Sequence, residues 1–283
     1  MLASSAGLEY PILEWLTPAR CAILAPMSIP GFLLPETTED CPYLSGRAFT
    51  TESFIAGNLT ESDMESFLAS GYRHFGPYFY RPVCKLCHQC VPLRIPLGRY
   101  TFSKSGRRVL ARGAKFVTAV ERPQPSSEAF ELYRKHKRRF KDSCSERDLE
   151  FEFQAFFHPF PFSFQLSVHD GSRLVAVSHL DVTENALSAI YCYYDDSYTR
   201  ESLGTFAINK EIEIGRERGA SFLYLGYYVA ENRHMSYKGR FHPSQVLRQE
   251  EEWIDYRDVK GKALNNDKEI EFFPKRRLQA EAS

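Results

Sequence analysis

The sequence predicts an α/β protein (α+β in the grouping of its elements) that is organised as two domains. The second half follows the order hairpin, strand, helix, strand, which is typical of a mixed sheet covered by helices. The first half carries a loop with three evenly spaced cysteines after a well-marked helix. A chain of 283 residues can bury one large core or, more comfortably, two domains.

Composition narrows the class of protein. Hydrophobic residues make up 43% of the chain and aromatic residues 14%, which indicates a globular protein with a filled interior. The 36 Lys and Arg residues balance 36 Asp and Glu, so a nonspecific polyanion binder is disfavoured, although a local basic face is still allowed. The start lacks the positive region of a secretory signal, so seven cysteines suggest a reducing compartment. We therefore expect a cytoplasmic protein with no membrane partner.

Three segments are expected along the chain. Residues 1–38 form an extension of unclear role, whose apolar run is broken by Pro26 and Pro30 and is too short to span a bilayer. Residues 39–122 form an N-terminal domain that contains the cysteine loop. The Pro- and Ser-rich stretch 122–127 reads as a linker that ends in a helix cap, so the C-terminal domain is placed at 123–283.

In the first half, the sequence predicts a helix that begins near residue 60. The signals are a cap (Thr60 or Ser62), an apolar face at i, i+3, i+4 spacing (Met64, Phe67, Leu68) and a left-handed terminal glycine (Gly71). The helix leads into residues 71–78, a loop dense in aromatic and cationic side chains, where recognition chemistry is often found.

In the second half, alternation predicts a strand at 115–121 and a hairpin of strands 164–168 and 174–180 around Asp170-Gly171. A strand at 186–194, a helix from about 202 to 219 and a strand at 222–225 follow, and the last two strands can be parallel through a right-handed crossover. Ligands in such sheets lie at strand C-termini and helix N-termini. The residues then expected around one cleft are Tyr194, Asp195, Gly204, Thr205, Gly226, Tyr227 and Tyr228.

The cysteine loop is a candidate metal site. Cys84, Cys87 and Cys90 fall three residues apart, and a fourth ligand would have to come from Cys41 or His88. Structural zinc sites more often show two separated CxxC pairs, so reduced thiols packed around a rigid loop are the alternative. Zinc, an iron–sulfur cluster or no metal all stay open, whereas a disulfide is disfavoured in a reducing compartment.

A basic stripe follows the cysteine loop, with almost no acid among its members: Arg94, Arg99, Lys104, Arg107, Arg108, Arg112 and Lys115. Lys and Arg in such a stripe bind phosphates with release of counterions, although a plain solvated face is also possible. A second basic cluster at 135–139 either extends this surface or is the wet face of an amphipathic helix.

Taken together, these motifs resemble the aminoacyl-tRNA–protein transferases. The matching stretches are Cys-Pro-Tyr-Leu-Ser-Gly-Arg (41–47), Gly-Tyr-Arg-His-Phe-Gly (71–76), Tyr-Arg-Pro-x-Cys-x-x-Cys-x-x-Cys-x-Pro-Leu-Arg (80–94), Lys-Ser-Gly-Arg-Arg (104–108), Ser-Leu-Gly-Thr (202–205), Leu-Gly-Tyr-Tyr (225–228) and Met-Ser-Tyr-Lys-x-x-Phe-x-Pro (235–243). Their order and spacing, over roughly residues 39 to 250, resemble the bacterial aspartate/glutamate leucyltransferase branch more than the eukaryotic arginyltransferases. The chain departs from the pattern at His74, where a second arginine is usual, and at Tyr228, where tryptophan is usual.

This resemblance implies transfer of an amino acid, leucine in this branch, from its tRNA to the N-terminal α-amine of a protein that begins with Asp or Glu. It also implies a C-terminal domain that resembles the N-acetyltransferase (GNAT-like) fold, and a role in N-end rule protein degradation. An arginyl donor is the alternative within the family. The donor ester is already activated, so no cofactor is required for the chemistry, and the α-amine has a pKa near 8. Positioning and oxyanion stabilisation can then lower most of the barrier.

The resemblance and the chemistry together nominate site residues. Arg73, His74, Arg81 and Arg94 are candidates for binding the acidic acceptor, because Arg grips a carboxylate bidentately. The candidates for contact with tRNA and its terminal aminoacyl-adenosine are Arg107, Arg108, Gly204, Thr205, Tyr227, Tyr228, Tyr237 and Lys238. Asp195 is the nominated proton acceptor and is grouped with Tyr191 as catalytic. Cys41, Cys84, Cys87 and Cys90 are the metal candidates.

Two rival functions use the same features. An acyl-CoA N-acyltransferase would hold pyrophosphate on a loop of the type R/Q-x-x-G-x-G/A, but residues 200–206 have one residue too many and lack the second small residue. A zinc-stapled RNA-binding module would use the basic stripe, but it leaves the second domain unexplained.

Overall fold

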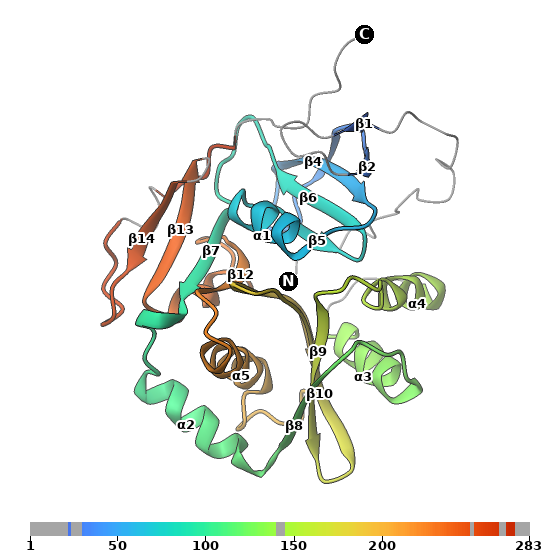
Figure 1. Cartoon of the computed structure of the whole chain (residues 1–283), viewed down its shortest axis with the longest axis vertical. Helices are drawn as coiled ribbons and strands as arrows, with labels where there is room; N and C mark the ends of the chain where they lie inside the picture. The colour runs from blue at the N-terminus through green and yellow to red at the C-terminus, as the bar shows by residue number, and fades with distance from the viewer. Residues whose placement is uncertain (1–21, 24–29, 140–144, 250–251, 266–269, 275–283) are drawn as a thin grey trace.

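The computed structural model describes residues 22–23, 30–139, 145–249, 252–265 and 270–274, and shows a mixed α/β protein built on two sheets (Figure 1). The predicted fold class is therefore confirmed. The helices are α1 (Glu61–Ala69), α2 (Lys104–Arg112), α3 (Ser127–Lys137), α4 (Glu146–Ala155), α5 (Leu203–Glu217) and the short 3-10 turns η1 (Leu97–Arg99), η2 (Gly113–Lys115) and η3 (Ser236–Arg240). The strands are β1 (Ala22–Ile23), β2 (Pro30–Leu33), β3 (Thr37–Asp40), β4 (Ala48–Ala56), β5 (Arg73–Phe75), β6 (Tyr78–Pro82), β7 (Val91–Pro96), β8 (Val117–Glu121), β9 (Ser163–Asp170), β10 (Arg173–Val182), β11 (Ala186–Tyr194), β12 (Phe222–Tyr228), β13 (Ser244–Gln249) and β14 (Glu252–Arg257).

The smaller sheet is antiparallel and has the order β1-β2-β4-β6-β5, with β3 also paired to β4. Helix α1 packs on it, and Met64, Phe67 and Leu68 are buried in the resulting core, as the i, i+3, i+4 pattern predicts. Thr60 caps the helix in a capping box with Asp63, and Gly71 follows it with φ +84°. The predicted helix and its cap are confirmed.

The larger sheet has the order β14-β13-β7-β12-β11-β10-β9-β8. The predicted hairpin is β9–β10 around Gly171, and the predicted crossover pair is β11–β12, which is parallel while its neighbours are antiparallel. Strands β7 and β8 precede the expected domain boundary at 122/123 and yet pair with strands that follow it. Both sides of that boundary therefore contribute to one sheet.

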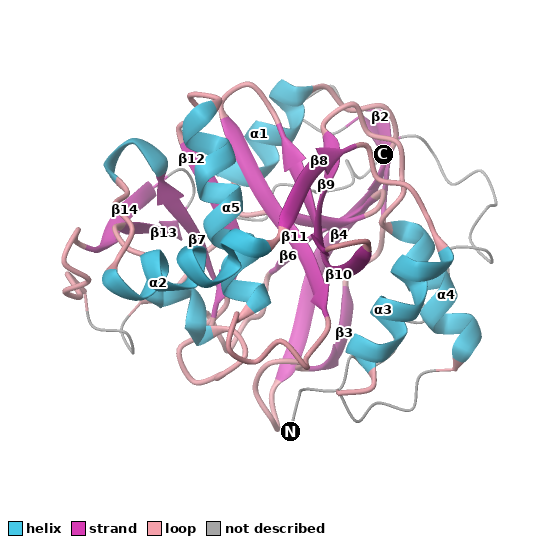
Figure 2. Ribbon diagram, turned by 90° about the horizontal axis from the view of Figure 1, so that it is seen from below, coloured by secondary structure: helices cyan, strands magenta, loops and turns pink. Residues whose placement is uncertain are grey.

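Helices cover the larger sheet on both faces. Helix α5 packs on β10–β12 with α2 beside it, and α3 and α4 lie together on the opposite side of β10 (Figures 1 and 2). Strand β10 contributes to two cores: Val177 packs with residues of α3 and α4, whereas Ala176 belongs to the core under α5. No helix in the described residues is long and apolar enough to cross a membrane.

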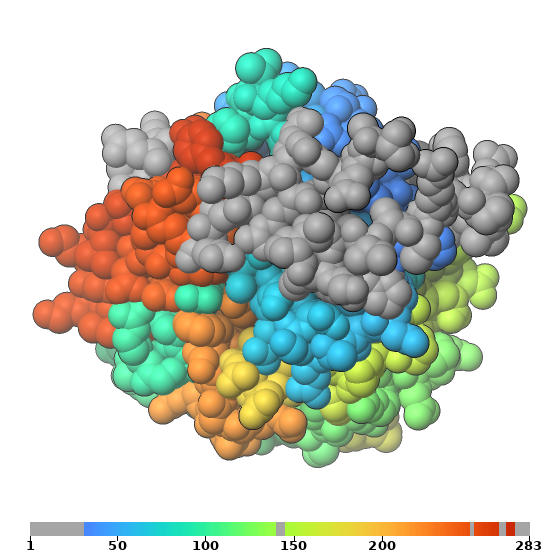
Figure 3. Space-filling view, turned by 45° about the horizontal axis from the view of Figure 1, so that its top comes forward, coloured from blue at the N-terminus to red at the C-terminus, as the bar shows by residue number. Residues whose placement is uncertain are grey.

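The expected extension at 1–38 falls mostly outside the described residues. Within it, β1 and β2 pair with each other, and β2 pairs with β4. The loop between β6 and β7, which carries the cysteines, projects from the surface in Figure 3, and the side chain of Leu86 at its tip is 98% exposed.

Candidate active site between the two sheets

Strands β11 and β12 pair along only part of their length. The parallel register joins Ala186–Ser188 to Phe222–Tyr224, and no further pair between the two strands is found among the described residues. Beyond that point β11 pairs only with β10, whereas β12 pairs with β7. The carboxyl ends of the two strands therefore separate, which is where α/β sheets bind ligands.

Arg73 reaches from the smaller sheet to this point of separation. It begins β5, and its side chain is buried, with only 8% of the residue exposed. One guanidinium nitrogen donates to Ser188 Oγ at 3.0 Å, and another donates to the carbonyl oxygen of Ala189. Arg73 thus caps the last paired residue of β11 with a positive charge.

Lys238 is a second buried cation at the same place. It lies in η3 with 7% exposed, and Nζ donates to the carbonyl oxygen of Tyr227 at 2.7 Å. Burial and the nearby charge of Arg73 lower its pKa to about 7, against a smaller opposing effect of Cys90. Neither cation forms an ion pair with an acidic side chain in the described part of the chain.

The side chains of Arg73 and Lys238 both approach Gly226. Its φ is +85°, just after a bulge in β12, so an L side chain there is strained. A Cβ atom at Gly226 would lie 3.4 Å from Arg73 Nε and 3.5 Å from Lys238 Nζ. A small anionic group beside Gly226 would therefore contact two cations at once.

Glu211 completes the group, although it was not among the predicted site residues. It is fully buried on α5, and Ser178 Oγ donates to its Oε1 at 2.7 Å. Burial raises its pKa to about 7, while the Ser178 hydrogen bond and the Arg73 charge act in the opposite direction. Its signal in the sequence is an acid on the apolar stripe of a helix, between Ile208 and Ile212.

The other predicted acceptor ligands have partners of their own. Arg81 is fully buried and donates to Glu52 Oε1 at 2.8 Å, and Tyr72 donates to the same oxygen. His74 lies between the Gly76 carbonyl oxygen and Asp181 Oδ2, at 2.8 Å from each. These contacts hold the strands and sheets together. Of the predicted acceptor ligands described so far, Arg73 is therefore the one that lies where β11 and β12 separate.

Arg94 is likewise enclosed. Its guanidinium lies 3.7 Å from the ring centroid of Phe222 and 4.2 Å from that of Trp253, and it donates to Gln245 and Tyr224. These contacts anchor β7 to its neighbours β12 and β13, and to β14 beyond β13. The sequence could not show these partners, because they lie far along the chain.

The two predicted catalytic residues, Asp195 and Tyr191, lie in surroundings that do not favour proton transfer. Burial alone would raise the pKa of Asp195, but hydrogen bonds from Lys135 and Ser197 lower it to about 2, and Arg173 also donates to its carboxylate. Such a low pKa makes Asp195 a weak proton acceptor at neutral pH. Tyr191 packs among aromatic rings, and burial raises its pKa above the usual range.

The three candidate stacking tyrosines divide into two kinds. Tyr227 and Tyr228 are buried, and their hydroxyls bond within the protein, to the Gly71 carbonyl oxygen and to the hydroxyl of Tyr256 respectively. Tyr237 is partly exposed and lies near Arg73 and Glu211, both of which affect its pKa. Of the three, Tyr237 is the one that is accessible to solvent.

Gly204 and Thr205 lie in the first turn of α5, next to the carboxyl end of β11. A Cβ at Gly204 would lie 3.1 Å from the ring of Tyr194. Gly204 therefore lies beside Tyr194. The predicted contact of Gly204 and Thr205 with the aminoacyl-adenosine stays a prediction.

The middle of the basic stripe, from Lys104 to Arg112, follows α2. Arg107 and Arg108 are exposed with no ion pair among the described residues, whereas Arg99 pairs with Asp255 and Lys115 with Asp170 and Glu201. The second cluster is mostly engaged inside the protein: Lys135 pairs with Asp195, Lys137 pairs with Glu152 and His136 is buried.

The cysteines gather at one end of the smaller sheet. Sγ of Cys41 accepts from the Leu44 amide, that of Cys84 from the Thr50 amide and that of Cys87 from Arg47. Burial raises the pKa of the Cys90 thiol, and so do the three other cysteines. N–H donors aimed at sulfur suit thiolate ligands, but no three metal-ligating side chains in the described residues are arranged around one point. Zinc or an iron–sulfur cluster here stays a prediction.

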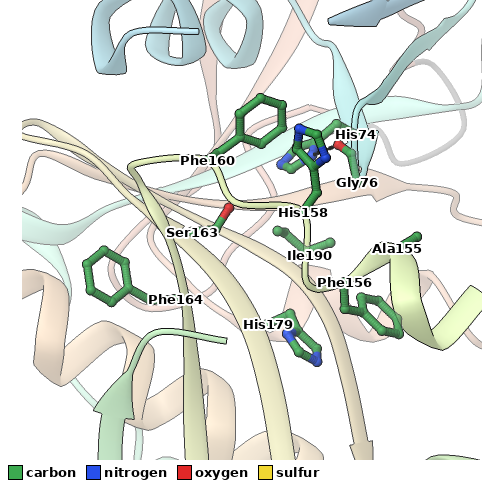
Figure 4. A pocket seen from close by; sticks show the side chains of 10 residues that line it. All are labelled: His74, Gly76, Ala155, Phe156, His158, Phe160, Ser163, Phe164, His179 and Ile190. Atoms are coloured by element: carbon green, nitrogen blue, oxygen red, sulfur yellow. Dashed lines mark hydrogen bonds between the residues drawn. The ribbon is translucent and has the colours of Figure 1, made fainter. Parts of the chain in front are cut away.

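A small cavity lies elsewhere, between α4 and strands β5, β9, β10 and β11 (Figure 4). Its volume is about 10 Å³, and the rings of His74, His158 and His179 contribute to its wall. Such a space holds about one water molecule and is too small for an amino-acid side chain. The separated strands, rather than this cavity, are therefore the candidate active site.

Two sequence-family models match the chain. "Arginine-tRNA-protein transferase, N terminus" matches residues 39–108, and "Arginine-tRNA-protein transferase, C terminus" matches residues 128–248. Curated relatives named aspartate/glutamate leucyltransferase are 32% identical in Campylobacter jejuni, 30% in Helicobacter hepaticus and 34% in Stenotrophomonas maltophilia. The matches cover 75%, 74% and 69% of this chain and 91%, 88% and 81% of those proteins.

Solved structures are more distant. FemX is 10% identical with a TM-score of 0.41, and the match covers 67% of each chain. The structure of L-PGS from Bacillus licheniformis is 15% identical with a TM-score of 0.40, and the match covers 62% of this chain and 54% of that one.

Proposed function

The chain belongs to the arginine-tRNA-protein transferase family, whose members transfer an amino acid from aminoacyl-tRNA to a protein, and from this premise we propose its donor and acceptor. The proposed donor is leucyl-tRNA, and the proposed acceptor is the α-amine of a protein that begins with Asp or Glu. The names of the curated relatives support both choices. We further propose that the added residue marks the acceptor for N-end rule degradation.

One observation carries the proposed acceptor, namely the pair of buried cations beside Gly226. Burying a charge without a counter-ion is costly, and Arg73 and Lys238 also repel each other. The carboxylate of an N-terminal Asp or Glu would neutralise this excess charge and would accept hydrogen bonds from both side chains. A neutral Asn or Gln would leave the repulsion in place.

The same placement positions the nucleophile. In an N-terminal Asp, only the α- and β-carbons separate the side-chain carboxylate from the reacting amine. Holding the carboxylate therefore holds the amine close to the carboxyl ends of β11 and β12, where the donor ester would have to enter. Orientation of this kind supplies a large part of the barrier reduction in acyl transfer.

The donor tRNA needs a surface for its backbone, and we propose α2. Lys104, Arg107 and Arg108 are exposed along this helix and form no ion pair among the described residues. Helix α2 packs on α5, which begins beside the carboxyl end of β11. A tRNA bound along α2 could therefore extend its terminal nucleotides toward the candidate active site.

The acceptor proposal is tested by transfer of labelled amino acid to peptides that begin with Asp, Glu, Asn or Lys. Wild-type protein should transfer from leucyl-tRNA to Asp and Glu peptides, and Lys238→Met should lower kcat/KM for the Asp peptide by about 10- to 100-fold because a charge-assisted contact is lost. The activity toward the Asn peptide should change little. Lys210→Met on α5 is the matched control, because Lys210 pairs with Glu213 away from the site.

A parallel assay with arginyl-tRNA in place of leucyl-tRNA identifies the donor. Transfer from arginyl-tRNA alone would replace leucine by arginine in the proposal. If the ratio of kcat/KM for the Asp peptide to that for the Asn peptide is the same in Lys238→Met as in wild type, the acceptor carboxylate is bound elsewhere.

Gly226 provides a test of the space itself. Gly226→Ala should raise KM for the Asp peptide by roughly tenfold or more, because the new methyl group occupies the position between the two cations. Gly219→Ala is the control: its φ is also positive, at +75°, but a Cβ there meets no atom within 4 Å. Both variants should lose about 1–2 kcal/mol of unfolding free energy from backbone strain. Equal KM values for the two variants would contradict the proposed acceptor site.

The α2 surface is tested by the salt dependence of kcat/KM for aminoacyl-tRNA. The double variant Arg107→Gln with Arg108→Gln should reduce the slope of log kcat/KM against log salt by about one per lost phosphate contact. Arg248→Gln is the control, since Arg248 pairs with Glu252 on β14. A slope that is unchanged in the double variant would place the tRNA on another face.

A further inference from the structure

Glu211 is a buried acid with one hydrogen-bond partner among the described residues. Its Oε1 accepts from Ser178, whereas its Oε2 has no hydrogen-bond partner in the described part of the structure. A buried carboxyl oxygen without a partner is rare in native proteins and calls for a functional or structural reason. An apolar side chain at this position would leave no such oxygen, so the acid calls for a functional reason.

The groups around Glu211 come from four elements packed against α5 or near it. Ser178 lies on β10, Cys192 on β11, Arg73 on β5 and Tyr237 in η3. Arg73 is the only cation that affects the pKa of Glu211 among them, and it does so without an ion pair. The charge of Arg73, one of the two cations that form the proposed acceptor site, therefore acts on Glu211.

We propose that Glu211 is the general base that takes the proton from the acceptor's α-ammonium group, with Oε2 as the accepting atom. This inference rests on the proposed acceptor site. A carboxylate held by Arg73 and Lys238 leaves the ammonium group two carbons away, and Glu211 is an acid without an ion pair among the described residues on which the charge of Arg73 acts. The site would then bind the acceptor's negative side chain with cations and its positive amine with an acid.

The step balances without a co-reactant. Glu211 accepts one proton from the ammonium group and passes it to solvent, and the neutral nitrogen forms a bond to the ester carbonyl carbon. The ester C–O bond then breaks, and the second proton of the nitrogen goes to the leaving ribose oxygen through Glu211. The products are the new peptide bond, the free tRNA hydroxyl and one released proton.

The environment of Glu211 suits this task. Burial raises its pKa to about 7, which places it close to the α-amine pKa of about 8, and proton transfer is most effective between groups of similar pKa. Ser178 favours the charged form by donating a hydrogen bond, and Arg73 favours it by its charge. Tyr237, whose pKa the charge of Glu211 helps to raise, is partly exposed to solvent.

The test compares Glu211→Gln with wild type in steady-state transfer to an Asp peptide, using whichever of leucyl- and arginyl-tRNA the wild type accepts. Glu211→Gln should lower kcat by about 10²- to 10⁴-fold with a change of only a few-fold in KM for the peptide. In wild type, kcat should rise with pH through a midpoint near 7. In the variant, the midpoint should move toward that of the amine, at about 8 or above.

Two further variants separate catalysis from structure. Ser178→Ala removes a hydrogen bond that favours the charged carboxylate, so it should move the wild-type midpoint to higher pH while Glu211 is still present. Glu213→Gln changes an acid on the partly exposed side of α5 and should leave both kcat and the midpoint unchanged.

The pH dependence of protein stability reports on the protonation of Glu211 without any substrate. The pKa of Glu211 is raised from 4.5 to about 7 in the folded protein, so the folded state keeps a proton that the unfolded chain loses. Its contribution to stability is therefore present below about pH 4.5 and is lost as the pH rises through 7. Relative to wild type, Glu211→Gln should gain melting temperature between pH 5 and pH 8.

The outcomes distinguish the two proposals. If wild type transfers to Asp peptides, but Glu211→Gln keeps a kcat within about threefold and the same midpoint, the general base is overturned and the acceptor site stands. If Glu211→Gln fails to fold, an unmoved midpoint in Ser178→Ala overturns it instead. If wild type shows no preference for acidic N-termini, the acceptor site fails, and the general base fails with it.

Discussion

Arg73 is the side chain on which both the joining of the sheets and the candidate active site depend. It belongs to the edge strand of the smaller sheet, yet its hydrogen bonds go to Ser188 and Ala189 of the larger one. Its neighbour His74 adds a second link, to Asp181 on β10. The two contacts hold β5 against the larger sheet at the place where β11 and β12 separate. The same guanidinium therefore fixes the architecture and supplies the charge of the site.

Much of the fold could be predicted because its signals are local. Thr60 and Gly71 bracket α1, and Gly171 turns the β9–β10 hairpin, since caps and turns depend on a few adjacent residues. The parallel pair followed from the length of the crossover between β11 and β12. Local signals could not show that the smaller sheet docks on β10 and β11, or that β7 is an inner strand of the larger sheet.

The site was harder to predict, because the role of a buried charge depends on its partner. Arg73 and Arg81 look alike in the sequence, but Glu52 on the neighbouring strand pairs with Arg81 and no acid pairs with Arg73 among the described residues. The strand end predicts Asp195 as a proton acceptor, but hydrogen bonds from Lys135 and Ser197 lower its pKa, and Arg173 also pairs with it. Glu211 had a readable signal, an acid on an apolar helix stripe, and this signal was not used.

A crystal structure with a bound acceptor peptide would show whether Arg73 and Lys238 bind the acidic side chain of the acceptor. A peptide that begins with Asp can be bound without tRNA, so no transfer occurs. We expect the Asp carboxylate beside Gly226, with its oxygens about 3 Å from nitrogens of Arg73 and Lys238. A carboxylate bound on another surface, with the two cations in their present positions and no anion between them, would overturn the proposed acceptor site.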